Sequence, residues 1–364
     1  MQSNTRHLRI PRTAAAALVG LLALVAAACG SSSSSSTTTS GAGSSTTSGA
    51  PVTLRLGYLT NLTHAAALVG LQQGILARNL PANVTLQTST YNAGPAEVTA
   101  LLAGSLDAAY MGPNSAITAY TQGNKSIRII SGATSGGAAL VVAPGITTAA
   151  QLKGKTLATP QLGNTQDVAL RTWLSKQGIT YPGPDGGSGE VTILPEDNST
   201  TLASFESGTI AGAWVPEPWA TRMVSEGHGH ILVNEKSLWP KGQFSTTVLV
   251  VNADFLSSHP SVVTDLLKGQ IATTKFLNAS PAQAQAAANT QLTTVTGKPL
   301  KASELAVAWS NLTFTNDPIA SSILTDLVHA KAVGFKTSNI SGIFAFGPAN
   351  QLLQAQGKST LSAP

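Results

Sequence analysis

The sequence predicts an α/β protein of two lobes, each lobe holding a mostly parallel sheet flanked by helices. Two observations lead to this prediction: strand and helix segments alternate from Val52 onward, and one helix–turn–strand pattern occurs twice. Alternation of this kind is typical of parallel sheets that are covered by helices. The 364-residue length suits two domains, and the composition of 42% apolar and 10% charged residues can bury a large core.

The first half of the mature chain alternates regularly. The expected strands are 52–59, 84–91, 106–111 and 127–134, and the expected helices are 63–77, 94–104 and 112–123. Thr63 is the expected N-cap of the first helix. In the second helix, Pro95 lies in the first turn, Glu97 lies near the positive end of the helix dipole, and Gly104 ends the helix.

The same pattern continues and then repeats. The next expected strands are 155–160, 190–194 and 209–215, the expected helices are 164–178 and 199–208, and residues 260–357 are expected to be mostly helical. When "ALLAGSLDAAYMGPN" is placed beside "ASFESGTIAGAWVPE", Gly104 aligns with Gly208 and Tyr110 aligns with Trp214. Both stretches are a helix, a glycine stop, a short strand and a proline-containing turn. This repeat indicates two lobes of similar build.

Residues 1–28 have the pattern of an export signal. Arg6, Arg9 and Arg12 form a basic region, residues 14–25 form an apolar region, and three alanines precede Cys29. The apolar run is too short and too rich in alanine to be expected to span a membrane. Cys29 is the only cysteine, so no internal disulfide is possible.

The stretch ending at Cys29 resembles a bacterial lipobox, with Ala26 where that motif most often has leucine. The resemblance implies that Cys29 is lipidated; the alternative is an ordinary secreted protein. Residues 29–50 are then a lipidated cysteine and a flexible Ser/Thr/Gly tether. Without the three arginines of the signal, the chain has 18 basic and 16 acidic residues, which gives a net charge of +2. Lysines and arginines do not cluster with aromatic residues, so nucleic-acid binding is not expected.

A ligand site is expected where strands end and helices begin. In open parallel sheets, ligands bind beyond the carboxyl ends of the strands. The free N–H groups of a helix start, together with hydroxyls and amides, can hold an oxyanion without adding charge. The predicted site residues are Thr60, Asn61, His64, Asn114, Ser115, Thr134, Ser135, Asn164, Thr165, Gln166, Trp214, Glu217 and Trp219. The last three belong to the stretch "GAWVPEPW", which is expected to form the wall of the site in lobe two.

Six of these candidates also have a structural interpretation. Asn164, Thr165 and Ser115 suit simple helix caps, and His64 suits an ordinary helix face. Trp219 could pack on the first turn of its own helix. Glu217 could cap the helix that follows it, although a carboxylate beside two tryptophans also suits an amine.

Five stretches together resemble the solute-binding proteins of ABC importers, in the nitrate/taurine/alkanesulfonate group of the type II periplasmic-binding fold. They are "LRLGYLTN", "ALLAGSLDAAYMGP", "GITTAAQLKGKTLATPQLGNTQDVALRTWL", "FESGTIAGAWVPEPWATR" and "FSTTVLVVNADFLSSHPSVV". The resemblance covers residues 52–350. It implies a two-strand hinge, with crossings near 141–143 and 247–251. Lobe one would comprise 51–142 and 249–364, and lobe two 143–248.

The resemblance implies a monomeric binder without a cofactor rather than an enzyme. Such a protein is anchored by lipid to the outer face of the cytoplasmic membrane and passes a small anion to a permease and its ATPase. The anion would be an aliphatic sulfonate, taurine or nitrate, enclosed by closure of the lobes.

An alternative is a binder of a thiamine-type pyrimidine or other heterocycle, with Trp214 stacked on the ring. An enzyme similar to thiamine-pyrimidine synthase is less favoured. Such enzymes rely on a cysteine-rich segment that binds iron, whereas Cys29 is the only cysteine of this sequence. The stretch "GHGH" (227–230) places two histidines in a glycine-rich turn, but no nearby cysteine or acidic pair supports metal binding, so no metal is expected.

Overall fold

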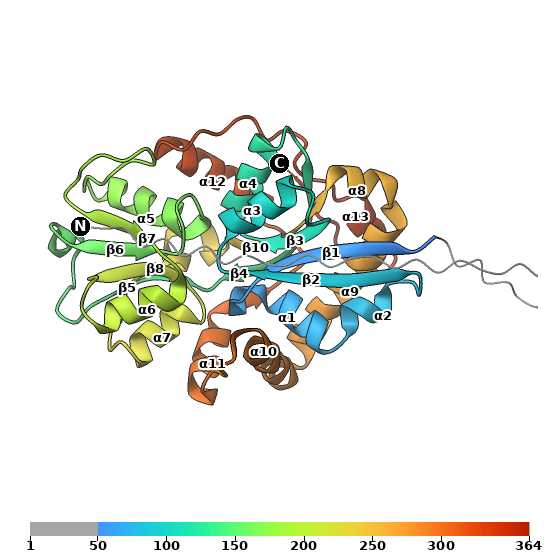
Figure 1. Cartoon of the computed structure of the whole chain (residues 1–364), viewed down its shortest axis with the longest axis horizontal. Coiled ribbons are helices and arrows are strands. Elements are labelled where there is room, and N and C mark those ends of the chain that lie inside the picture. Colours follow the sequence, from blue (N-terminus) through green and yellow to red (C-terminus); the bar gives the residue numbers. More distant parts are fainter. Residues whose placement is uncertain (1–49, 364) are drawn as a thin grey trace, which may run out of the picture. The chain divides into compact units, whose positions relative to one another are not determined.

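The computed structural model describes residues 50–363. The expected export signal, Cys29 and nearly all of the tether lie outside the described residues. The described residues contain two mixed β-sheets with helices packed against them, and these form two lobes (Figure 1). The predicted two-lobed α/β fold is confirmed. The sheets are mixed and not mostly parallel as expected, because β10 (Ser245–Asn252) and β5 (Ala138–Val142) enter them antiparallel to their neighbours.

Sheet one has six strands in the order β11-β4-β10-β3-β1-β2. Their bounds are β1 Val52–Leu59, β2 Val84–Tyr91, β3 Ala108–Met111, β4 Ile127–Gly136, β10 Ser245–Asn252 and β11 Leu312–Phe314. Strand β1 runs parallel to β2 and β3, whereas β10 is antiparallel to both β3 and β4. The short strand β11, which was not expected from the sequence, pairs antiparallel with β4.

Sheet two has five strands in the order β7-β6-β8-β5-β9. Their bounds are β5 Ala138–Val142, β6 Thr156–Thr159, β7 Thr192–Pro195, β8 Gly212–Pro216 and β9 His230–Asn234. Strands β3 and β8 occupy equivalent places in their sheets. Each lies between a parallel and an antiparallel neighbour, β3 between β1 and β10 and β8 between β6 and β5. The aligned glycines, Gly104 and Gly208, both have left-handed φ angles, of 70° and 74°. The two sheets therefore share one arrangement, as the repeated pattern predicts.

The chain crosses between the sheets twice. The first crossing is at Gly136 and Gly137, and the second lies within residues 235–244, between β9 and β10. The first crossing comes earlier than the expected 141–143, because β5 already pairs with β8 and β9 of sheet two. The second also comes earlier than the expected 247–251, because β10 enters sheet one at Ser245. A fully apolar run such as "AALVV" does not indicate which sheet it will join.

Helices cover both sheets. They are α1 Ala65–Gln72, α2 Ile75–Asn79, α3 Gly94–Leu102, α4 Pro113–Gln122, α5 Thr165–Lys176, α6 Asn198–Glu206, α7 Trp219–Ser225, α8 Ala253–Ser258, α9 Pro260–Ala279, α10 Pro281–Thr296, α11 Ala302–Ser310, α12 Ala320–Ala332 and α13 Gly347–Gln354. The expected helix 63–77 is interrupted at Gly74, whose φ is 63°, and Thr63 lies in a short 3₁₀ turn instead of capping α1. Among the described residues, no helix has both the length and the apolar character that a membrane span requires.

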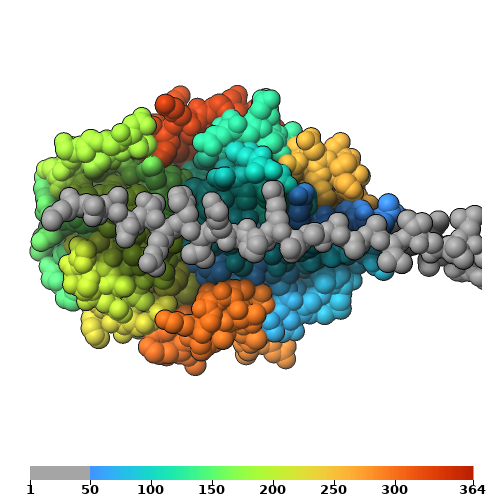
Figure 2. All heavy atoms as spheres, viewed as in Figure 1, coloured from blue at the N-terminus to red at the C-terminus, as the bar shows by residue number. Residues whose placement is uncertain are grey.

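The C-terminal helices contact both lobes. Helix α11 packs on α7 of lobe two, while α12 contacts α4 of lobe one and α5 of lobe two. In Figure 2 the orange atoms of the α10–α11 region lie directly beside the yellow atoms of lobe two. Val168 of α5 forms a small buried cluster with Ala330 and Val333 from the end of α12 and the residue after it. The segment expected only to complete lobe one therefore also joins the lobes.

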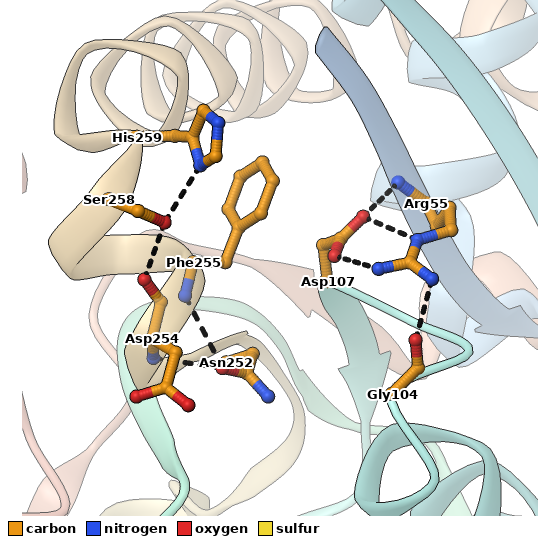
Figure 3. A network of polar contacts seen from close by, with 8 residues as sticks. All are labelled: Arg55, Gly104, Asp107, Asn252, Asp254, Phe255, Ser258 and His259. Atoms are coloured by element: carbon orange, nitrogen blue, oxygen red, sulfur yellow. Dashed lines mark hydrogen bonds and ion pairs between the residues drawn. The ribbon is translucent and has the colours of Figure 1, made fainter.

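A polar network secures sheet one near the amino end of β3 (Figure 3). The Asp107 carboxylate accepts hydrogen bonds from the guanidinium of Arg55 at 2.5 and 2.9 Å. The backbone oxygen of Asp107 accepts from the N–H of Asn252, whose side chain caps α8 through Asp254 at 2.9 Å. This network ties β1, β3 and β10 to α8 at the end of β3 remote from its carboxyl end.

The crossing at Gly136 generates a test with a matched control. Gly136 has a φ of 80°, and a Cβ there would lie 2.8 Å from the carbonyl oxygen of Asn311, whereas Gly208 has a φ of 74° and open space around it. We expect Gly208→Ala to lower the free energy of unfolding by about 1 kcal/mol, the cost of the left-handed backbone alone. Gly136→Ala should lower it by about 2–4 kcal/mol, because it adds a steric clash.

Urea denaturation of both variants and the wild type measures the difference. Equal losses for the two variants would show that the crossing at Gly136 tolerates a side chain.

Candidate functional site

A groove of about 680 Å³ lies between the lobes, where strands of both sheets end. Lobe one contributes Thr60 and Asn61, which follow β1, and Asn92, which follows β2. Lobe two contributes residues that follow β7 and β8. They are Asp197, Asn198, Pro218, Trp219 and Arg222. This is the position at which open parallel sheets bind ligands.

Two hydrogen bonds join the walls of this groove. The indole Nε1 of Trp219 donates to Oδ1 of Asn61 at 2.9 Å, and Nδ2 of Asn92 donates to a carboxylate oxygen of Asp197 at 2.9 Å. The guanidinium of Arg222 lies 4.8 Å from the centre of a Trp219 ring, within cation–π range. The groove walls are therefore already in contact across the two lobes.

The groove has no excess of positive charge. Its lining includes four acidic residues, Asp197, Glu206, Glu226 and Glu304, and three basic residues, Arg222, Lys298 and Lys301. The Arg222 guanidinium pairs with Glu226 at 2.6 Å, and the Lys301 ammonium pairs with Glu304 at 3.1 Å. Binding an anion here would therefore depend largely on neutral donors, namely amides and the free N–H groups of the backbone.

A second cavity, of about 400 Å³, lies on the other flank of the interlobe region. It is bounded by α3, α4, the start of α5 and the end of α12, whereas the first groove is bounded by α6, α7, α10 and α11 (Figure 1). The candidates Asn114 and Ser115 line this second cavity. The two lobes are in contact between these two spaces, where Gly112 of lobe one packs against Thr165 of lobe two. The contact is so close that a Cβ added to Gly112 would lie 2.5 Å from Oγ1 of Thr165.

The start of α5 holds the candidates Asn164, Thr165 and Gln166, all of them buried. Oδ1 of Asn164 accepts the N–H of Asp167 at 2.8 Å, so Asn164 is the N-cap of this helix. The Asp167 carboxylate accepts from the N–H of Gly163 at 2.9 Å and pairs with Arg171 at 2.9 Å. The carboxylate of Asp167 therefore already lies at the positive N-terminal end of α5, where a ligand oxyanion was expected to bind.

Three other candidates are buried within lobe one. Nδ1 of His64 accepts the backbone N–H of Leu59 at 3.2 Å, and burial lowers the pKa of His64 to about 3, so the ring is neutral. Ser135 and Thr134 lie on β4, and Oγ of Ser135 accepts the N–H of Phe244 at 3.4 Å. Neither cavity described above includes these three residues in its lining.

Trp214 lies in the core of lobe two and not on the wall of the site, so this expectation was wrong. Its side chain is fully buried beside Trp173, with the ring centres 6.3 Å apart, and its Nε1 donates to Glu235 at 2.7 Å. Burial raises the pKa of Glu235 to about 7, against the effect of its bonds from indole N–H groups. Strand β8 is the central strand of its sheet, so its side chains point alternately into the two cores that cover the faces of the sheet. Only the residues that follow the strand line the groove.

Glu217 is also buried, and both of its carboxylate oxygens have partners within the protein. Oε1 accepts from Nδ2 of Asn311 at 2.7 Å, and Oε2 accepts from the N–H of Thr221 in the first turn of α7 at 3.1 Å. Burial raises the pKa of Glu217, while these hydrogen bonds act in the opposite direction. The capping interpretation is the one that the structure shows, whereas the proposed contact with a ligand amine would require these bonds to change.

Thirteen predicted site residues therefore separate into groups. Thr60, Asn61 and Trp219 line the groove, and the two α4 residues line the second cavity. Sequence reasoning missed Asn92, Asp197 and Arg222. Asn92 directly follows the expected strand 84–91, and Asp197 comes three residues after the expected strand 190–194. The same strand-end argument could therefore have found both, whereas Arg222 carried no such signal.

The expectation that the chain carries no metal rested on the absence of clustered ligands. Within residues 50–363, no group of three His, Cys, Asp or Glu side chains is placed to hold a metal ion. His230, from the stretch "GHGH", instead contacts the carbonyl oxygen of Ile146 at 2.9 Å.

Two similar sheets joined by two crossings, with a groove at their strand ends, define the class of two-lobed periplasmic binding proteins. The alkanesulfonate-binding protein SsuA from Xanthomonas axonopodis pv. citri, solved with MOPS bound, matches with a TM-score of 0.66 and 18% identity over 82% of this chain and 100% of that one. The periplasmic nitrate-binding protein NrtA from Synechocystis PCC 6803 matches with a TM-score of 0.67 and 16% identity over 84% of this chain and 89% of that one. At these identities the matches show the fold.

The protein belongs to the NMT1-like family, whose model matches residues 48–292. A protein of Brucella abortus (strain 2308), named as a binding protein, is 28% identical over 240 residues, which are 64% of this chain and 69% of that protein. The nitrate/nitrite binding protein NrtA of Synechococcus elongatus is 29% identical over 106 residues, 29% of this chain and 22% of that protein. The family expected from the sequence is confirmed.

Proposed function

We propose that the protein is an exported solute-binding protein that delivers a small solute to an ABC importer. The observation that carries this proposal is the groove formed by strand ends of both lobes, with Asn61 and Asn92 facing Trp219 and Asp197. Two lobes joined by two crossings can close on a ligand by a hinge motion. The proposal implies a permease and its ATPase as partners, and a monomeric binder without a cofactor.

The proposed ligand is a small anion of the aliphatic sulfonate, taurine or nitrate class. With the basic side chains largely paired, neutral amides such as Asn61 and Asn92 would donate to the oxyanion. The half-buried indole of Trp219 would pack on the carbon portion of a sulfonate. The structural relatives SsuA and NrtA are alkanesulfonate-binding and nitrate-binding proteins, which supports this class.

A second candidate is a thiamine-type pyrimidine or another heterocycle. The observation in its favour is again Trp219, because an indole ring in a groove can stack on a flat ligand. The stacking residue would then be Trp219 and not the core residue Trp214.

A thermal-shift panel tests the proposal directly. The panel contains taurine, ethanesulfonate, nitrate, bicarbonate and a 4-amino-5-hydroxymethylpyrimidine, each tested against the full chain. A solute present at 100 times its dissociation constant should stabilise the protein by about 2.7 kcal/mol. Trp219→Leu should weaken binding of the active solute by about 1–3 kcal/mol, the scale of one buried apolar side chain.

Trp239→Phe is the matched control, because Trp239 stacks on Phe244 and does not line the groove. It should leave the affinity unchanged. A response to no solute would contradict the proposed function, and equal affinity in Trp219→Leu and wild type would place the solute elsewhere.

We further propose that Cys29 is lipidated and that the protein is held at the outer face of the cytoplasmic membrane. The sequence before Cys29 supports this proposal, as does the polar tether that follows it. Cys29→Ala should move the protein from the membrane fraction to the soluble fraction while leaving solute affinity unchanged. Membrane fractionation with immunoblotting measures this, with a deletion of residues 31–50 as the control that should stay membrane-bound. A Cys29→Ala protein still attached to membranes would exclude the lipid anchor.

A further inference from the structure

A pair of buried carboxyl groups lies where the second crossing meets the C-terminal segment. Glu235 begins the crossing and is 2% exposed, and Asp326 of α12 is 4% exposed. The carboxylate of Glu235 accepts from the indole Nε1 of Trp214 at 2.7 Å and from that of Trp239 at 3.4 Å. Oδ2 of Asp326 has no hydrogen-bond partner among the described residues. Within residues 50–363, neither carboxyl group forms an ion pair with a basic side chain.

One face of α12 holds the crossing in place. Ser322, Asp326 and His329 are spaced by four and three residues, so they lie on the same face of this helix. Oγ of Ser322 accepts the N–H of Ser245, where the crossing enters β10, at 2.9 Å. The ring of His329 packs on Trp239 of the crossing, with the ring centres 5.7 Å apart. Asp326 lies between these two contacts, within electrostatic range of the carboxyl group of the crossing.

The surroundings favour the protonated form of both carboxyl groups. Burial raises the pKa of Glu235 to about 7, although its bonds from indole N–H groups act in the opposite direction. Burial, together with the charge of Glu235, raises the pKa of Asp326 well above its usual value. A buried carboxylate without a cation is costly, and two such carboxylates also repel each other.

The neighbouring cations do not neutralise the pair. Lys236 follows Glu235 but extends toward the first crossing, since a Cβ on Gly136 would lie 3.2 Å from its Nζ. Burial and the charge of Lys176 lower the pKa of His329, so this ring is mainly neutral at pH 7. Helix α4 and strands β5, β8 and β10 carry no charged side chain. The other charged or titratable groups on the surrounding elements are Lys241 of the crossing, His230 of β9, Asp167 and Arg171 of α5, and Lys331 of α12.

We propose that the second crossing is a pH-sensitive joint, which is held against α12 while Glu235 and Asp326 are protonated and loosens as they ionise. When the crossing separates from α12, both carboxyl groups reach water and ionise in their ordinary range. The separated form therefore binds fewer protons than the docked form, so a rise in pH favours separation. This effect begins above the ordinary carboxyl range and continues through pH 7.

Hydrogen exchange followed by mass spectrometry measures the opening of the crossing in the full chain. The reporters are the amides of Phe244 and Ser245, which donate to Ser135 and Ser322. The exchange rate of a peptide covering residues 235–247, divided by the intrinsic amide rate at each pH, gives the opening constant. In the wild type we expect this constant to rise at least tenfold between pH 5.5 and 7.5, because each unit by which a pKa is raised contributes up to tenfold.

Glu235→Gln, Asp326→Asn and the double variant keep the side-chain sizes and remove the charges. The double variant should reduce the rise to less than threefold, and each single variant should give an intermediate value. Glu97→Gln is the matched control, because Glu97 is buried in lobe one with both carboxylate oxygens unpaired, and it should keep the wild-type rise.

Two results would overturn the proposal. One is an opening constant that does not rise in the wild type, a series that needs no substitution and so decides even where a variant does not fold. The other is an undiminished rise in the double variant, which would assign the pH dependence to other groups.

Discussion

The buried carboxylate of Glu217 is the interaction on which the joining of the two lobes depends. It accepts from Thr221 in lobe two and from Asn311 in the C-terminal segment, at 3.1 and 2.7 Å. The backbone of the same residue donates to the carbonyl oxygen of Gly137 at the first crossing and accepts from Leu62 after β1. A carboxylate this deeply buried is tolerable only because each oxygen is hydrogen-bonded. One residue thus fixes the end of β8, the crossing, the β1 loop and the C-terminal segment together.

The consequences reach both interlobe spaces. Trp219 and Arg222 lie in α7, which begins two residues after Glu217. The hydrogen bonds of Glu217 therefore also fix the position of these two residues in the groove wall of lobe two. The C-terminal segment held through Asn311 continues into α12, whose end bounds the second cavity. Thr165 touches Gly112 between the two spaces. The arrangement therefore bounds two separate interlobe spaces, one with a largely polar lining and one with a mainly apolar lining.

Much of this architecture could be predicted from the sequence. The alternation of strands and helices identified the fold class, and the glycine stops at 104 and 208 indicated the repeat that relates the two sheets. The strand-end argument located Asn61 and Trp219 at the groove. The argument failed for Trp214 because the alternation of strand residues does not show where the strand ends. Trp214 lies within the strand, so its side chain packs into the core against one face of the sheet and does not line the groove. The sequence could not reveal that Asn311 pairs with Glu217, because the two residues are 94 positions apart and share no local pattern. The capping interpretation of Glu217 was available from its position before α7.

A double-mutant cycle on Glu217 and Asn311 tests most directly whether this pair joins the lobes. Glu217→Ala, Asn311→Ala and the double variant are compared with wild type by urea denaturation at pH 7. A hydrogen bond to a buried charged group predicts a coupling energy of at least about 1.5 kcal/mol, with Glu217→Ala as the more destabilising single change. Losses that add within about 0.5 kcal/mol would contradict the account, because the two side chains would then act independently of each other.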